Sequence, residues 1–181
     1  MNSSTQGKRR PLLSLREICI FAMLATLMFV SKKAMEALPN IHLVGMLTIV
    51  YTLCYRVKAL IPIYVYVFLD GLFLGFSPWW VPYLYVWTVL WGATMLFPRR
   101  APRIVKVIAL PILCALHGLF FGVLYAPVQA ILFDLTYEEM LVWIAAGVGF
   151  DVLHAIGNFC VGLLILPMSE LLMKVSRQKN N

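Results

Sequence analysis

Three polar side chains recur along one apolar segment near the C-terminus. Asp151, His154 and Asn158 are spaced i, i+3 and i+7, which places them on one face of a helix. Polar groups in apolar segments are costly and face a protein interior or a wet cavity. The spacing therefore predicts either a buried structural network or contacts with a polar ligand. We favour ligand contact, because other polar groups are expected near the same depth.

A second stripe follows steps of four residues in the preceding apolar segment. Its members are His117, Phe121, Tyr125 and Gln129. Small residues lie beside this stripe and would let another helix approach closely. They are Gly118, Gly122 and Ala126.

Aromatic and charged residues complete the candidate site. Trp79, Trp80 and Tyr83 are typical of a membrane-interface belt and would also suit the wall of a pocket. Asp70 is a candidate ligand contact or a hydrogen-bond partner in helix packing. Lys33 is a candidate contact for a carboxylate or a solvated loop charge.

The segments that carry these residues are too apolar for a soluble domain. The chain has 181 residues, of which 62% are hydrophobic and 13% charged. It is predicted to be a single all-α integral membrane domain over residues 1–181, a bundle of six transmembrane helices with disordered ends at 1–10 and 175–181. The expected spans are 15–30, 41–55, 59–76, 79–97, 104–133 and 139–173. Pro111 and Pro127 should kink the fifth span.

The basic residues give this bundle an orientation. With six spans, only Lys32 and Lys33 of the fifteen Lys and Arg residues fall on one side, which leaves thirteen on the other. Cytoplasmic loops are enriched in Lys and Arg, so both termini are predicted to be cytoplasmic. The candidate site residues then lie from the midplane outward, as in a pocket open to the outside. Basic groups at the ends of apolar segments fit an anionic membrane surface and argue against nucleic acid as a partner.

Three stretches resemble the S component of an energy-coupling factor (ECF) transporter, the membrane-embedded binding subunit of vitamin importers. They are residues 22–26 (AMLAT), 55–60 (YRVKAL) and 150–158 (FDVLHAIGN). The resemblance extends over residues 15–172 mainly as a pattern of spans.

The resemblance implies a non-enzymatic subunit that captures a small water-soluble vitamin or related heterocycle at a bacterial cell membrane. ATP would be hydrolysed by two cytoplasmic ATPase subunits, coupled through a shared transmembrane subunit, and the chain itself would need no cofactor or metal. Small residues on the first helix would dock on that subunit, here Ala22, Ala25 and Thr26. The residues expected to bind substrate are Lys33, Asp70, Trp79, Trp80, Tyr83, His117, Tyr125, Gln129, Asp151, His154 and Asn158.

Other functions stay open. Asp70, Asp151, His117 and His154 could relay protons in a stand-alone proton-coupled transporter of a small metabolite. An intramembrane metal-dependent enzyme and a metal-ion S component are further alternatives. The substrate is also undecided: the aromatic and acidic residues suit a cationic or neutral heterocycle, whereas the outer lysines suit a carboxylate.

The predicted orientation can be tested with reporter fusions. Because both termini should be cytoplasmic, alkaline phosphatase, which becomes active only outside the cytoplasm, should be inactive when fused to either end. β-Galactosidase should be active at both positions. An active phosphatase fusion at either terminus would contradict the orientation.

Overall fold

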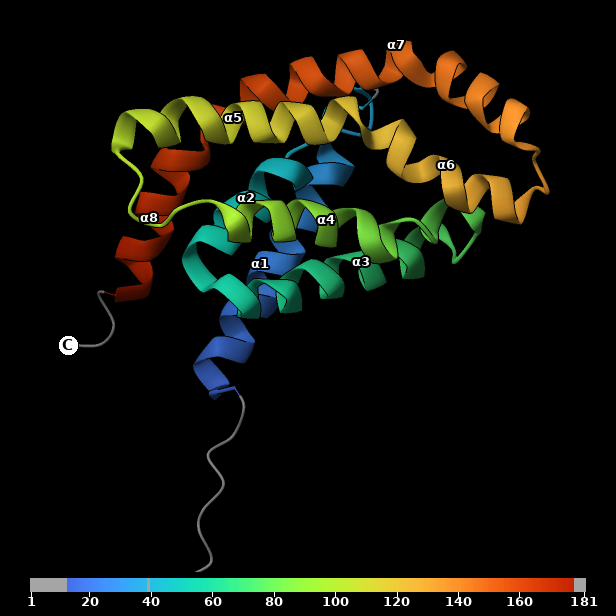
Figure 1. Ribbon diagram of the computed structural model, residues 1–181. Coiled ribbons are helices and arrows are strands. Elements are labelled where there is room, and N and C mark those ends of the chain that lie inside the picture. Colours follow the sequence, from blue (N-terminus) through green and yellow to red (C-terminus); the bar gives the residue numbers. More distant parts are fainter. Residues whose placement is uncertain (1–12, 39, 178–181) are drawn as a thin grey trace, which may run out of the picture.

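The computed structural model describes residues 13–38 and 40–177, and within these ranges all regular secondary structure is helical (Figure 1). The elements are α1 (Leu15–Ala34), α2 (Val44–Tyr55), η1 (Arg56–Ala59), α3 (Leu60–Leu74), η2 (Pro78–Trp80), α4 (Tyr83–Leu96), α5 (Arg103–Leu119), α6 (Phe121–Leu132), α7 (Tyr137–Gly162) and α8 (Ile165–Arg177). The 3₁₀ turn η1 connects α2 directly to α3, and only Phe120 separates α5 from α6. With α2, η1 and α3 counted as one helix and α5 with α6 as another, the described residues form six helices. The predicted all-α class is confirmed.

Three of these helices are long and apolar enough to cross a membrane. They are Val44–Leu74, Arg103–Leu132 and Tyr137–Gly162. Many large apolar side chains are exposed on the molecular surface, for example Phe68 and Phe73 on α3 and Ile108 on α5. An apolar surface this extensive is unfavourable in water and suits a lipid environment. The chain is thus a multi-pass membrane protein by the length and composition of its helices, and six crossings stay a prediction.

Two helices begin at capping boxes. The Ser14 hydroxyl accepts a hydrogen bond from the Glu17 N–H, and the Glu17 carboxylate accepts one from the Ser14 N–H. Thr136 and Glu139 form the same reciprocal pair at the start of α7. These contacts satisfy backbone donors that have no partner inside the first turn of a helix. They therefore determine where α1 and α7 begin.

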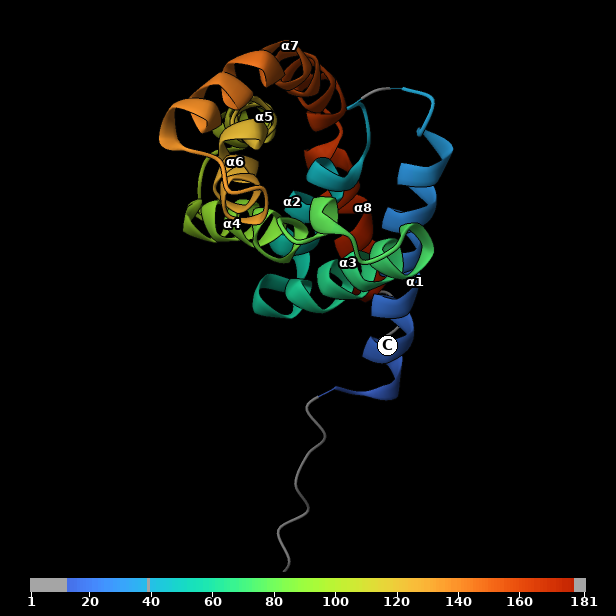
Figure 2. The same cartoon turned by 90° about the vertical axis from the view of Figure 1, so that its right-hand side faces the viewer.

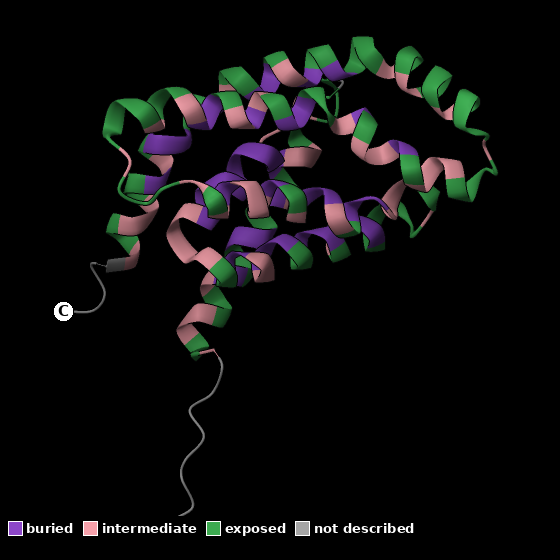
Figure 3. Cartoon of the chain, in the orientation of Figure 1, coloured by how far each residue is buried: buried purple, intermediate pink, exposed green. Residues whose placement is uncertain are grey.

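Helix α2 lies at the centre of the fold. All nine residues from Val44 to Thr52 are buried, and α2 contacts α1, α4, α5, α7 and α8 (Figure 3). Helix α1 packs along α3 on one side of it. On the other side α7 runs antiparallel along α5 and continues beside α6, as both views show (Figures 1 and 2). The core is thus arranged around α2, with the α5–α6–α7 group on one face and α1 with α3 on the other.

The predicted sixth span, 139–173, is divided in two. Helix α7 ends at Gly162, and α8 begins at Ile165, turns away from α7 and packs on α2 (Figure 1). Pro167 lies in the first turn of α8, where the missing proline N–H costs nothing. The same proline cannot continue the hydrogen bonding of α7. Residues 175–177, expected in the disordered end, form the last part of α8, and the rest of both expected disordered ends lies outside the described residues.

The interruption of the fifth predicted span is also not where we expected it. Pro111 and Pro127 both lie inside helices, α5 and α6, and the helix is interrupted at Phe120. This break exposes the backbone N–H groups at the start of α6. Because the first N–H groups of a helix have no partner inside the helix, these donors must hydrogen-bond to groups from another part of the fold.

Candidate functional site

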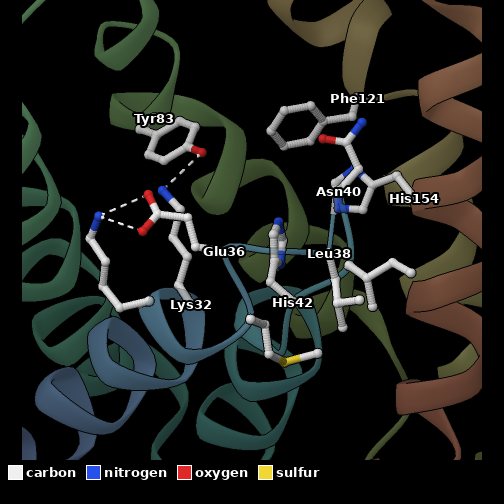
Figure 4. Close-up of a pocket in the computed structure, with 11 residues that line it drawn as sticks. Lys32, Glu36, Leu38, Asn40, His42, Tyr83, Phe121 and His154 are labelled. Carbon is white, nitrogen blue, oxygen red and sulfur yellow. Dashed lines mark hydrogen bonds and ion pairs between the residues drawn. The ribbon is translucent and has the colours of Figure 1, made fainter.

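A cavity of about 180 Å³ lies against the segment that joins α1 to α2 (Figure 4). The middle of α7 and the junction of α5 with α6 also border it, through His154 and Phe121. The lining residues are Lys32, Lys33, Met35, Glu36, Leu38, Asn40, Ile41, His42, Tyr83, Phe121 and His154. Most of them come from one short segment, 32–42.

Lys32 connects this cavity to a buried carboxylate. Its ammonium lies 2.5 Å from Asp70 Oδ2 and 3.3 Å from the Tyr83 hydroxyl. The ammonium also lies 4.8 Å from the centre of the Tyr83 ring and 5.6 Å from that of Trp79, which are favourable cation–π positions. The Asp70 side chain is completely buried, whereas that of Lys32 is 19% exposed. Without Lys32, Asp70 would be a buried charge with no counter-ion, which typically costs about 3–5 kcal/mol.

Two histidines face one another at the cavity. The ring centres of His42 and His154 are 5.0 Å apart, with the rings nearly perpendicular. His42 Nδ1 and His154 Nε2 are buried and have no hydrogen-bond partner among the described residues. A buried polar atom left without a partner costs about 1–3 kcal/mol. These two nitrogens are therefore candidate contacts for a polar ligand.

The other lysine of the cavity is paired at its rim. Lys33 Nζ lies 3.0 Å from Glu36 Oε1 and 3.2 Å from Oε2 (Figure 4). Both side chains are partly or largely exposed, so the pair is screened by solvent and contributes little to stability.

Aromatic rings form the wall behind the cavity. Trp87 is 1% exposed and its ring centre lies 6.0 Å from that of His42 and 5.9 Å from that of Phe121. Phe121 stacks on Tyr125 with ring centres 5.0 Å apart. Tyr125 itself does not line the cavity, and its hydroxyl donates to the Trp79 carbonyl at 2.6 Å. Tyr125 and Trp79 thus support the wall from behind.

Asp151 and Asn158 hold α7 against α5 and α6. The Gly122 N–H donates to both oxygens of Asp151, at 3.1 and 3.2 Å. This carboxylate therefore caps the start of α6, where the helix dipole also favours a negative charge. Asn158 Nδ2 donates to the Cys114 carbonyl at 3.2 Å. Neither residue lines the cavity, so in this structure both have the role of a buried structural network.

The predicted small-residue face is the contact surface for α7. A methyl group at Gly118 would lie 3.0 Å from the His154 backbone, and one at Gly122 would lie 2.4 Å from Asp151 Oδ2. At the far end, Gly162 of α7 packs against the backbone of Pro111. The expected close approach of a second helix is confirmed.

The remaining predicted site residues lie away from the cavity. His117 Nε2 lies 3.1 Å from the Val86 carbonyl, and Trp80 Nε1 donates to the Val67 carbonyl at 2.8 Å. Gln129 is half-buried on α6. The structure thus brings Lys33, Tyr83 and His154 together at the cavity, with Asp70 directly behind Lys32.

The expected binding set did not contain Glu36, Asn40, His42 and Phe121, although all four line the cavity. Lys32, which also lines it, was considered only together with Lys33, as an outer lysine that suits a carboxylate. A signal was present in the sequence. Residues 32–42 contain five polar or ionisable side chains between two apolar segments. Such a loop is a common location for binding residues.

On α1, the residues expected to dock on a partner subunit are divided between two faces. Ala22 and Thr26 are exposed, one turn apart, and the Thr26 hydroxyl donates to the Ala22 carbonyl at 2.9 Å. Ala25 is completely buried in the core. Only Ala22 and Thr26 of the three are therefore accessible in this conformation.

Within the part of the chain that the structure describes, no three His, Cys, Asp or Glu side chains come together in a group that could hold an ion. Comparison with protein-family models, with curated proteins and with solved structures finds no match for this chain. The fold and the cavity define the class, an all-α membrane protein with a small polar pocket between its helices.

The Asp151 cap predicts that Gly122 tolerates no side chain. Gly122→Ala would place a methyl group 2.4 Å from Asp151 Oδ2 and force apart the carboxylate and the N–H groups of α6. We expect a loss of about 2 kcal/mol in the free energy of unfolding, the value of a charge-assisted hydrogen bond. Thermal unfolding of the purified protein in detergent measures this change.

Gly147→Ala on α7 is the matched control, because nothing lies within 4 Å of the added methyl group. Its stability should be equal to or slightly above that of the parent, since alanine is favoured over glycine in helices. Equal unfolding temperatures for Gly122→Ala and Gly147→Ala would contradict the capping role.

Proposed function

We propose that this chain is the substrate-binding membrane subunit of an ECF-type importer, which captures a small water-soluble vitamin or related heterocycle at the outer side of a bacterial cell membrane. Partner subunits would then drive uptake with ATP. The observation that carries the proposal is the cavity between α1, α4, α6 and α7, in which polar groups without partners face a small enclosed space.

The chemistry of the cavity suits recognition of a small polar ring. Phe121 and the two imidazoles offer flat surfaces, while His42, His154, Lys32 and Tyr83 offer hydrogen bonds. Its volume of about 180 Å³ is below the roughly 300–1,000 Å³ of drug-sized sites. A single-ring compound is therefore the expected size.

Contacts between the basic segments support the proposed orientation. Lys58 pairs with Glu17, which joins the turn after α2 to the start of α1. The Arg56 side chain donates to the Met95 carbonyl near the end of α4, and Arg103 of α5 pairs with Glu170 of α8. The basic segments thus gather at one end of the fold, away from the cavity segment 32–42. A cytoplasmic location for that end leaves the cavity open to the outside.

Energy for uptake would come from other chains. The sequence has no Walker A motif, and nothing about binding in the cavity requires chemistry on the ligand. A transmembrane coupling subunit and two cytoplasmic ATPases are the partners that the resemblance implies. The exposed pair Ala22 and Thr26 on α1 offers a small-residue surface where a partner helix can approach closely.

A proton-coupled transporter is the second candidate, favoured by one specific observation. His42 and His154 place two unpartnered ring nitrogens at a cavity beside Lys32 and Asp70, where protons could be exchanged. Uptake by this chain alone in vesicles with a proton gradient and no ATPase would favour this candidate. Uptake that requires ATP and the partner subunits would favour the importer.

The importer proposal predicts tight binding by the isolated subunit. The purified protein should bind one compound from a panel of vitamins and precursors without ATP, as measured by calorimetry. His154→Leu should weaken that binding about 3- to 10-fold, because one hydrogen bond to the ligand is lost.

Phe159→Leu is a suitable control, since Phe159 is exposed on another part of the α7 surface. It should bind like the parent chain. Unchanged affinity in His154→Leu would remove His154 from the binding site, and failure of the parent protein to bind any panel compound would contradict the proposed function.

A further inference from the structure

We propose that the ligand of this cavity carries a carboxylate and that Lys32 is the residue that receives it. This inference rests on the proposed binding function and names the substrate class for the same site. It chooses between the two ligand classes, cationic or neutral heterocycle and carboxylate, that the sequence leaves open.

The Lys32–Asp70 ion pair presents its positive end to the cavity. The Asp70 side chain is completely buried and does not line the cavity, whereas Lys32 lines it and retains 19% exposure. A ligand in the cavity therefore meets the positive end of the pair first. A cationic group would have to approach an ammonium before it reached the carboxylate behind it, which is unfavourable at low dielectric.

The Lys32 ammonium has one more N–H donor than it has acceptors among the described residues. An ammonium group carries three N–H donors. Among the described residues, the structure provides it with two acceptors, Asp70 Oδ2 and the Tyr83 hydroxyl. The third donor can hydrogen-bond to a ligand in the cavity without loss of the existing contacts.

The other charges at the cavity do not compete for this role. Lys33 is held by both oxygens of Glu36, so those two charges balance each other at the rim. His42 and His154 each add a ring nitrogen without a partner among the described residues, and in the tautomer that places the N–H there this nitrogen can donate to an anionic group beside Lys32. Lys32 is thus the cation of the lining whose partner carboxylate, Asp70, lies behind the cavity wall and does not line the cavity.

The same cavity walls limit the size of the part of the ligand beyond its carboxylate. Phe121 and the imidazole of His154 both line the cavity, in an edge-to-face arrangement with an interplanar angle of 66° and ring centres 4.9 Å apart. With a cavity of about 180 Å³, the structure points to a small ring or short apolar body that ends in a carboxylate.

Matched pairs of compounds test this inference. The purified full chain is titrated with nicotinate and nicotinamide, lipoate and lipoamide, and tryptophan and tryptophan amide, with thiamine and pyridoxine as cationic and neutral compounds. Binding is followed by tryptophan fluorescence and calorimetry. We expect a carboxylate to bind, and to bind about 10- to 100-fold more tightly than its amide, as a charge-assisted hydrogen bond implies.

Two variants separate ligand recognition from folding. Lys32→Met alone would leave Asp70 buried without a counter-ion, so Lys32 is replaced together with Asp70→Asn, which removes both charges. This double variant should fold, as judged by its unfolding temperature, and lose the preference for carboxylate over amide. Asp70→Asn alone keeps the ammonium and should retain or increase that preference. Lys106→Met, which removes a cation distant from the cavity, should behave like the parent chain.

The outcomes distinguish failure of the carboxylate inference from failure of the proposed binding function. Preferential binding of amides, thiamine or pyridoxine would overturn the carboxylate inference and leave the binding function in place. A double variant that folds and keeps the carboxylate preference would overturn the assignment of Lys32. If no panel compound binds at millimolar concentration, both the inference and the proposed function fail.

Discussion

The hydrogen bonds from the Gly122 N–H to Asp151 are the contact on which the position of the cavity depends. They close the break between α5 and α6 and join it to the middle of α7. Glycines at 118 and 122 let the two backbones come close enough for this contact. One helical turn further along α7, the same approach places His154 beside Phe121 and opposite His42. The structural network and the cavity lining are thus consecutive parts of one helix face.

The apolar environment explains why so few polar groups are buried and why each is informative. Water is not available inside such a bundle, so polar side chains must find partners within the protein. Asp151, Asn158 and Asp70 each have at least one such partner, which is a backbone N–H, a carbonyl and an ammonium respectively. Asp70 Oδ1, Asn158 Oδ1 and His117 Nδ1 are nevertheless buried without a hydrogen-bond partner among the described residues, as are His42 Nδ1 and His154 Nε2. His42 and His154 differ from the others in position, because both line the cavity.

Much of the helical architecture could be read from local patterns. The apolar segments predicted the helical regions, although the second and third predicted spans form one helical stretch, Val44–Leu74, and the sixth is divided into α7 and α8. The small-residue stripe of residues 118–126 predicted a close helix contact. The Ser14–Glu17 and Thr136–Glu139 spacings are capping-box signatures that could have located the start of α1 and α7 more accurately. The position of Pro167 likewise contained the information for a separate α8, although a continuous apolar run concealed it.

The sequence by itself determined the helical class, the approximate helices and the face that carries Asp151, His154 and Asn158. Only the tertiary structure decided that the first and last of these three hold helices together while the middle one lines a cavity. It also paired Lys32 with Asp70, residues 38 positions apart. The physical reason is that helical periodicity specifies which residues share a face, whereas the partner of that face is set by long-range packing. A polar side chain is structural or available to a ligand according to that partner.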